Sequence, residues 1–200
     1  EKWQLSKTNE EAYKSFRNYY NQTKNPLDLY VLMCYSFNYQ FRFNGNHDYN
    51  NPFGRNRSSF NEVMRNNLIL FKQQIEDIHF SACDFCDFDY DILNTGDFIY
   101  ADPPYLLTCG SYNDGKRGFR GWTKKDDLDL MQILTELSER GVNFALSNVI
   151  EHKGSTNDAL IGWITYNGYN VHGINFNYHN CNYHTNNRKN VTKEVLITNY

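Results

Sequence analysis

The sequence lacks an apolar run close to the ~18 residues that a membrane-spanning helix needs, which predicts no membrane span and no membrane partner. It also lacks a strong net charge, because the formal net charge is -3 at pH 7 and the sequence pI is about 6.1. Internal repeats and low-complexity linkers are absent as well. A nucleic-acid-binding surface must therefore be a local patch and not a property of the whole chain.

Cysteines are few and scattered, and their count of five is odd. This usage argues against a disulfide framework and favours a reducing compartment. Cys83 and Cys86 form a Cys-x-x-Cys pair, which could be half of a zinc site or a redox pair. Because His179, Cys181 and His184 lie far along the chain, we expect no metal and two small buried cysteines near a strand end.

Charge is segregated along the chain. Residues 76–102 contain eight acidic residues and no Lys or Arg, whereas basic residues predominate in 41–72 and again in 188–193. A basic loop rich in Asn, Gly and aromatic residues could contact phosphates. An ordinary solvated surface would have the same composition, so charge alone leaves both interpretations open.

The hydrophobic pattern predicts two kinds of structure. The first third predicts helices over 10–19, 26–37 and from Ser58 or Ser59 to Gln74, with a hairpin or ordered loop over 41–53. Later residues alternate between strands and helices, which indicates an α/β sheet with crossovers. The expected buried strands are 78–81, 97–101, 142–147, 171–176 and 194–198, and the expected helices are 124–139, with Leu128, Leu130, Met131, Leu134 and Leu137 inward, and 158–167.

The most informative stretch is Asp102-Pro103-Pro104-Tyr105, which follows a predicted strand. In open α/β sheets the loops at the carboxyl ends of strands carry the site. The prolines stiffen the turn and leave carbonyls available, so the Asp102 carboxylate and the Pro103 carbonyl offer two acceptors beside the flat face of Tyr105. Such a set suits a planar group that bears an amino group. The alternative is a rigid loop in which Asp102 only caps a helix.

The stretch Asp102-Pro103-Pro104-Tyr105 resembles the catalytic motif of amino-methylating DNA methyltransferases. The segments 35–38, 41–44 and 49–55 look like the target-recognition hairpin of the Dam-type adenine methyltransferases. Residues 141–148 are similar to the strand that follows the family's catalytic motif, and 193–200 resemble its closing strand. The pieces occur in family order over residues 10 to 200.

The resemblance implies a mechanism in which adenine leaves the double helix and enters a pocket. Asp102 and the Pro103 carbonyl would accept the two hydrogens of the N6 amino group and direct its lone pair toward the methyl group. Tyr105 would stack on the base. The methyl donor would be S-adenosylmethionine, and no metal would be required.

The resemblance also assigns DNA-binding roles in the hairpin. Arg42 would read a guanine, and Phe37 would wedge into the opened helix. Gln40 stands where relatives that recognise GATC carry a small or aliphatic residue, so the target sequence stays open. Residues Asn38, Pro52 and Arg55 would also face DNA.

Three of these assignments have simpler alternatives. Phe37 also fits the apolar face of a helix, so it could belong to the core. Arg55 could be an ordinary solvated charge, and Pro52 could only form a turn. The loop's composition does not decide between these alternatives.

The cofactor site departs most from the family pattern. The family has a Gly-rich loop upstream of the hairpin, and no strand–Gly-x-Gly–helix unit occurs here before residue 76. Asp84 and Phe85 resemble the family's contact to the cofactor adenine, with Asp102 nearby, although a strand-end turn is the alternative. Because the chain starts at Glu1 and not at Met, we expect a piece of a longer gene product that is inactive alone.

Together these points predict an α/β, Rossmann-like methyltransferase sheet, incomplete at its amino end, in residues 76–200. Residues 1–75 would form an α-rich DNA-recognition subdomain. The expected activity is site-specific methylation of adenine N6 in double-stranded DNA, in a restriction–modification or phage-type system in the bacterial cytoplasm. A non-catalytic DNA-binding fragment and a cytosine-N4 methyltransferase are the alternatives.

Overall fold

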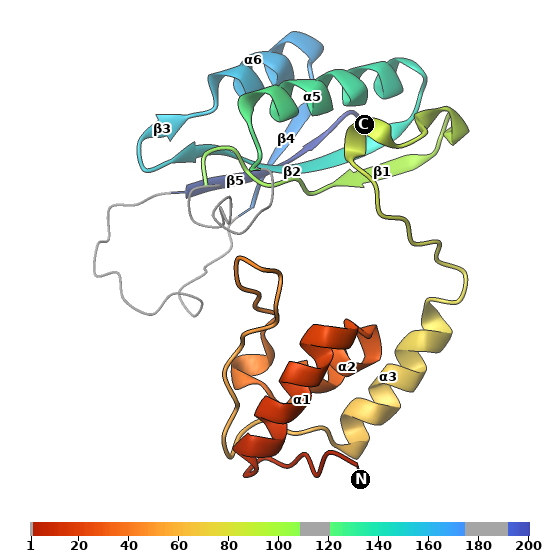
Figure 1. Ribbon diagram of the computed structural model, residues 1–200. Coiled ribbons are helices and arrows are strands. Elements are labelled where there is room, and N and C mark those ends of the chain that lie inside the picture. Colours follow the sequence, from red (N-terminus) through yellow and green to blue (C-terminus); the bar gives the residue numbers. More distant parts are fainter. Residues whose placement is uncertain (1, 109–120, 175–191) are drawn as a thin grey trace. The chain divides into compact units, whose positions relative to one another are not determined.

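The computed structural model describes residues 2–108, 121–174 and 192–200 (Figure 1). Contacts within the chain divide it into an N-terminal unit that reaches Ser81 and a C-terminal unit that starts at Ala82. No helix in these described ranges is both long and apolar enough to cross a membrane.

Two capped helices open the N-terminal unit. α1 (Glu10–Thr23) starts after Asn9, whose side chain accepts the Ala12 N–H at 3.1 Å. It ends at Lys24, which adopts a left-handed conformation with φ 53°. α2 (Pro26–Tyr35) then begins with proline at its first position, where the missing N–H costs no hydrogen bond. Both helices start where the sequence predicts, but α1 continues beyond its expected end at residue 19, and α2 ends at Tyr35 and not at residue 37.

The core of the N-terminal unit is aromatic. Residues from α1, α2 and the loop after them are buried against one another, and the rings of Tyr20 and Tyr49 meet edge to face at 6.1 Å. This packing ties the loop to α1. The buried members are Tyr13, Phe16, Tyr20, Leu32 and Tyr49.

α3 (Glu62–Gln74) is capped by Asn61, so the expected start at Ser58 or Ser59 is wrong. The Asn61 side chain accepts an N–H of the first turn at 3.0 Å. Ser58 instead donates its backbone N–H to the Gly54 carbonyl at 3.0 Å and is buried in a turn. α3 contributes no buried residue to the described unit.

The expected strand over 78–81 is also wrong. These residues are irregular and exposed, with Phe80 74% exposed. A short stretch of alternating apolar and polar residues does not specify a strand unless a neighbouring strand pairs with it, and no described strand pairs with this one.

A mixed sheet forms the centre of the C-terminal unit. Its order is β1-β2-β5-β4, with the short β3 (Ser155–Thr156) paired to β2. β1 and β2 are parallel, whereas β5 runs antiparallel to both of its neighbours. The strands span Phe98–Ala101 (β1), Asn143–His152 (β2), Asn170–Ile174 (β4) and Thr192–Thr198 (β5).

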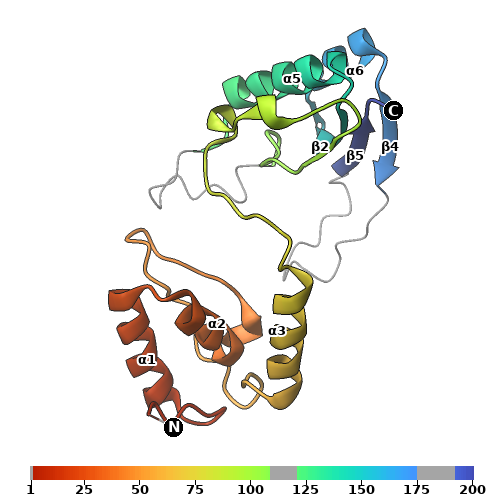
Figure 2. The same ribbon diagram turned by 90° about the vertical axis from the view of Figure 1, so that its right-hand side faces the viewer.

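Two helices connect these strands and lie side by side on one face of the sheet, as the two views show (Figures 1 and 2). α5 (Lys124–Glu139) lies in the connection between β1 and β2, and α6 (Asp158–Asn167) lies between β2 and β4. The α/β architecture expected from the sequence is thus confirmed. The insertion of β5 between β2 and β4 was not part of that expectation.

The core of the C-terminal unit lies between the helices and the sheet. Leu128 is 47% exposed, so its expected inward position is wrong, because it lies on the opposite side of α5 from Leu130. The buried members are Leu130, Met131, Leu134, Phe144, Leu146, Leu160, Ile164, Val195 and Ile197.

β1 is less buried than expected. Phe98 is 54% exposed and Tyr100 is 60% exposed, whereas Ile99 and Ala101 pack against the core. Among the described residues β1 pairs with β2 alone, and α5 and α6 cover only one face of the sheet. Alternate side chains of β1 therefore face away from the core.

Candidate active site and DNA-facing loop

The Asp-Pro-Pro-Tyr motif lies directly beyond the carboxyl end of β1. Ala101, the last residue of β1, is in register with Leu146 on the parallel strand β2. Ser147 therefore lies level with the motif on the neighbouring strand. Asp102 is exposed, and its carboxylate accepts a hydrogen bond from the hydroxyl of Tyr105, a loop residue, instead of capping a helix. The carboxylate thus stands at the edge of the sheet where α/β sites form.

Tyr105 joins three elements of the C-terminal unit through its hydroxyl group. The Oη atom lies 3.0 Å from Asp102 Oδ1, 2.7 Å from Ser147 Oγ and 3.2 Å from Glu194 Oε1. Burial raises the pKa of the Tyr105 hydroxyl above its usual value, so the group stays protonated. Because it has one proton, it donates to one carboxylate at a time and can accept from Ser147.

Sequence reasoning missed Ser147 and Glu194. The rule that sites form level with strand ends could have found Ser147, because it sits in a predicted strand beside the motif. Glu194 comes from β5, and only the antiparallel insertion of that strand next to β2 brings it to Tyr105.

A pocket of about 340 Å³ opens beside the motif. Asp102, Pro103 and Pro104 line one part of it, and Phe85 and Trp122 line another. The rings of Phe85 and Trp122 are 5.2 Å apart at an interplanar angle of 39°. The structure thus brings Phe85 and the motif together, and it adds Trp122, which the sequence did not single out.

Asp84 has a different position from Phe85. Its side chain accepts the Cys86 N–H at 3.0 Å and caps the single helical turn η2 (Phe85–Asp87). The residue is exposed and does not line the pocket. Asp84 therefore shapes the turn from which Phe85 reaches the pocket. No described strand precedes this turn, so the strand-end turn expected as the alternative is not formed.

Cys83 and Cys86 are exposed, so their expected burial is wrong. They flank a turn at the surface and do not end a strand. No group of metal-ligating side chains occurs in the described ranges. His179, Cys181 and His184 lie outside those ranges.

The expected DNA-recognition hairpin is a loop with little strand pairing. It spans residues 36–55, and its backbone contacts include two isolated bridges, Ser36 to Phe53 and Phe43 to Tyr49. Side chains supply much of the remaining support. Tyr13 on α1 donates its hydroxyl to the Asn51 carbonyl at 2.9 Å.

Two buried side chains hold the loop from inside. Asn51 donates its amide group to the carbonyls of Phe37 at 3.0 Å and Gln40 at 3.1 Å. The Tyr49 hydroxyl also donates to the Gln40 carbonyl, at 3.0 Å. The Gln40 carbonyl thus accepts two hydrogen bonds, although Gln40 is an exposed residue.

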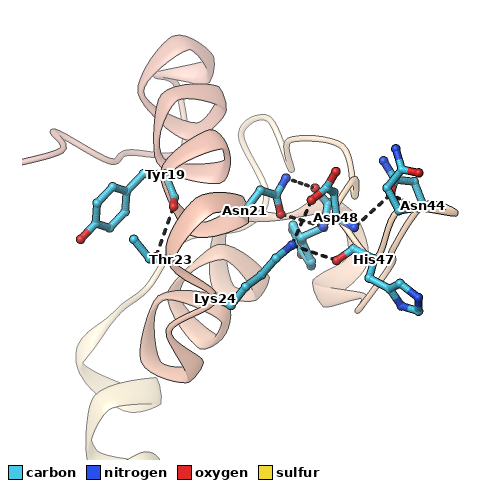
Figure 3. Close-up of polar contacts among 9 residues, drawn as sticks. Tyr19, Asn21, Thr23, Lys24, Asn44, His47 and Asp48 are labelled. Atoms are coloured by element: carbon cyan, nitrogen blue, oxygen red, sulfur yellow. Dashed lines mark hydrogen bonds and ion pairs between the residues drawn. The ribbon is translucent and has the colours of Figure 1, made fainter.

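The tip of the loop is fastened to the end of α1 (Figure 3). Asn21 forms two bonds with Tyr49, accepting its N–H at 2.8 Å and donating to its carbonyl at 3.1 Å. Lys24 donates to the His47 carbonyl and to the Asp48 carboxylate, both at 3.0 Å. Asn44 in turn accepts the Asp48 N–H at 2.9 Å. Side chains of α1 therefore replace a partner strand.

The loop presents aromatic and basic side chains to solvent. Phe37 is 42% exposed, so the alternative that it belongs to the core is wrong. Tyr39 and Phe41, which the sequence did not single out, are exposed beside it in the chain. Arg42 is exposed, and its carbonyl accepts the Asn50 N–H at 2.9 Å.

The three other predicted DNA-facing residues have distinct surroundings. Asn38 is exposed and left-handed, with φ 53°. Pro52 is exposed, and its carbonyl accepts the Phe37 N–H at 2.8 Å, which closes the base of the loop. Arg55 forms an exposed ion pair with Glu10 on α1, and this contact and Lys14 lower the pKa of the Glu10 carboxyl.

Comparison with known proteins agrees with this geometry. The type II methyltransferase M.FokI of Planomicrobium okeanokoites is 50% identical over 202 residues, and the modification methylase StsI of Streptococcus sanguinis is 52% identical over 202 residues. Both alignments cover 100% of this chain and 31% of the relative. The chain thus spans about a third of the length of these relatives.

A more distant similarity links the chain to the DNA adenine methylase of Escherichia coli strain K12. The two are 26% identical over 145 residues, which cover 69% of this chain and 50% of that protein. The model of the D12 class N6 adenine-specific DNA methyltransferase family matches residues 1–192. Because this match covers nearly the whole chain, the chain belongs to the D12 class N6 adenine-specific DNA methyltransferase family.

Proposed function

We propose that this chain is part of an enzyme that methylates N6 of adenine at a specific site in double-stranded DNA. The observation that carries the proposal is that Phe85 and the Asp102-Pro103-Pro104 segment line the same pocket. One wall of that pocket can hold an aromatic ring, and another offers acceptors for an amino group. Membership of the D12 class supports adenine over cytosine as the base.

The methyl donor in this proposal is S-adenosylmethionine, whose sulfonium supplies an electrophilic methyl group. The residues present fit such a ligand. Phe85 and Trp122 form an aromatic wall for its adenine, and Asp102 places a carboxylate on the same pocket. Asp84 supports this wall by capping the turn that carries Phe85.

Asp102 and Pro103 are the proposed catalytic acceptors. The Asp102 carboxylate is exposed at the end of β1, where an incoming amino group can reach it. Proline has no N–H, so the Pro103 carbonyl faces no competing backbone donor from its own residue. Two acceptors that bind the amino hydrogens hold the nitrogen lone pair in one direction, which lowers the barrier by orientation.

Tyr105 is the proposed stacking residue for the flipped base. Its hydroxyl is held by Asp102, Ser147 and Glu194, which fixes the ring next to the acceptors. A ring fixed in advance loses little conformational freedom when a base stacks on it.

The N-terminal unit is the proposed target-recognition subdomain, and residues from Ala82 onward belong to the proposed catalytic core. In the loop over 36–55, Arg42 reads a guanine edge and Phe37 fills the space that the flipped base leaves. Asn38, Gln40, Pro52 and Arg55 are the further proposed DNA contacts. The names of the relatives support a bacterial modification enzyme, which would work in the cytoplasm.

The experiment replaces Asp102 by Ala in the full protein and measures methyl transfer to DNA beside DNA affinity. Methyl transfer should fall at least about 100-fold with DNA affinity kept, because the carboxylate orients the amino group and not the duplex. Asp97→Asn is the matched control, since Asp97 precedes the other end of β1 and its side chain accepts the Asn94 N–H at 2.8 Å. Wild-type turnover in Asp102→Ala would contradict the proposal.

A further inference from the structure

Asp127 is a buried acid with no assigned part in the proposed chemistry. It is 3% exposed, near the start of α5. Its Oδ1 atom accepts the Trp122 indole N–H at 2.8 Å, and its Oδ2 atom accepts the Asn157 amide at 2.9 Å. Both partners are neutral, so the two hydrogen bonds offset only part of the cost of burying this carboxylate.

The location of Asp127 makes a buried charge tolerable. It lies in the first turn of α5, where free N–H groups and the helix dipole favour negative charge. Two converging donors also require an acceptor on both oxygens. An asparagine could accept only one of these bonds, because its amide nitrogen would face the other donor.

Asn157 connects Asp127 to rigid parts of the C-terminal unit. Its backbone N–H donates to the Ile150 carbonyl of β2 at 3.0 Å, and its side-chain oxygen caps α6 by accepting the Leu160 N–H at 3.2 Å. Asn157 is itself buried. Through Asn157, the Asp127 carboxylate is therefore held in place by β2 and α6.

The other oxygen of Asp127 binds Trp122, a residue in the wall of the pocket. Trp122 lines the pocket beside Asp102, and its ring lies 5.2 Å from that of Phe85. An indole can rotate about its side-chain bonds unless its N–H is held, and rotation would change the width of the aromatic wall.

We propose that Asp127 is a positioning residue that fixes Trp122 against Phe85 and thereby sets the affinity of the pocket for the adenine end of the methyl donor. The identity of this ligand rests on the proposed function. The position of the indole does not, because it follows from the hydrogen bonds among Asp127, Trp122 and Asn157.

The first test reads the indole directly, without a ligand. In the full protein labelled with ¹⁵N at tryptophan, the Trp122 indole N–H signal, assigned with Trp122→Phe, should lie downfield and exchange slowly with solvent. Asp127→Asn should move it upfield and speed its exchange. Asp126→Asn is the control, because Asp126 is equally buried but bonds to Thr123 at the helix cap. An unchanged signal in Asp127→Asn would overturn the positioning role.

The second test measures affinity for S-adenosylmethionine by calorimetry. Asp127→Asn and Trp122→Phe should each weaken binding about tenfold, since a hydrogen bond to a charged group is lost in both. The double variant should be no weaker than either single variant, because both changes break the same link. Asp126→Asn should keep wild-type affinity.

Each outcome separates the inference from the proposed function. Additive losses in the double variant, or wild-type affinity in Asp127→Asn, would overturn the inference while leaving the proposed methylation intact. If the wild-type protein methylates DNA and all four variants bind S-adenosylmethionine with equal affinity, the inference is likewise overturned and the proposed methylation stands. A wild-type protein without affinity for S-adenosylmethionine would contradict the proposed function, and the indole signal would still decide whether Asp127 positions Trp122.

Discussion

The two units of the molecule hold their candidate functional residues in different ways. In the C-terminal unit, backbone pairing between β1 and β2 sets the level of the Asp102 motif. In the N-terminal unit, the loop over 36–55 has isolated bridges, and side chains such as Asn21 and Asn51 bind its backbone. The position of the candidate catalytic residues thus follows from sheet geometry, whereas that of the candidate recognition residues depends on individual polar side chains.

This difference has a consequence for substitution. Regular pairing spreads the support of a site over many backbone bonds, so single changes at the surface of the sheet should matter little. A loop that rests on a few side chains concentrates its support, so removing one of them should shift the loop without unfolding the unit. Substitutions in each unit can test the contrast.

The largest effect is expected in the core of the C-terminal unit. Phe144 is fully buried and contacts the rings of Trp163 and Tyr169 at 5.9 and 5.1 Å. Phe144→Ala should lower the free energy of unfolding of this unit by about 3–5 kcal/mol, because it leaves a cavity. Hydrogen exchange followed by mass spectrometry should show faster exchange from Ala82 onward and unchanged exchange before it. Equal acceleration in both units would contradict the division.

A smaller effect is expected for the proposed guanine reader. Arg42→Ala should cost about 1–3 kcal/mol of discrimination at one base pair, because a bidentate contact to one base is lost. Affinities for duplexes that differ from the methylated site by single base pairs provide the measurement. A loss that is the same for every duplex would show that Arg42 anchors the DNA and does not read it.

Removing a side chain that supports the loop should reduce discrimination less than removing the proposed guanine reader. Asn21→Ala removes both bonds to Tyr49 and should cost about 1–2 kcal/mol of discrimination, because the loop then samples other positions. Asn18→Ala, an exposed position on the same helix, serves as the matched control. Protection of the Tyr49 amide against hydrogen exchange should fall in parallel. If the Tyr49 amide keeps its protection in Asn21→Ala, packing of the Tyr49 ring in the core is sufficient to hold the loop.

The smallest effect is expected at Arg55. Its ion pair with Glu10 is exposed, and such pairs contribute little to stability. Arg55→Ala should weaken DNA binding evenly across sequences and reduce the slope of affinity against salt by about 1, as loss of one phosphate contact does. Titrations at several salt concentrations give the slope. A change confined to one base pair would instead assign Arg55 to base recognition.

The elements that the sequence predicted well carry their own local signals. α5 and α6 begin and end where they were expected, since Thr123 and Asn157 cap them and Gly141 and Gly168 follow with positive φ. The sheet was recognisable because strands alternate with these helices. Local chemistry alone was enough for this part of the fold.

The elements that the sequence mispredicted depend on partners that are distant in the chain. The segment 78–81 has no described strand to pair with, so it stays irregular. Glu194 reaches Tyr105 only because β5 inserts between β2 and β4. Trp122 and Asp127 share a partly buried hydrogen bond, and a sequence pattern does not show which polar side chains pair in this way.

The most direct test of the central claim identifies the atom that receives the methyl group. The full protein is incubated with double-stranded DNA and S-adenosylmethionine with a labelled methyl group, and the digested nucleosides are separated by mass spectrometry. We expect label in N6-methyl-2′-deoxyadenosine from the wild-type protein, little from Asp102→Ala and a wild-type amount from Asp97→Asn. Label in N4-methyl-2′-deoxycytidine, or in N6-methyl-2′-deoxyadenosine at equal yield from Asp102→Ala, would contradict the central claim.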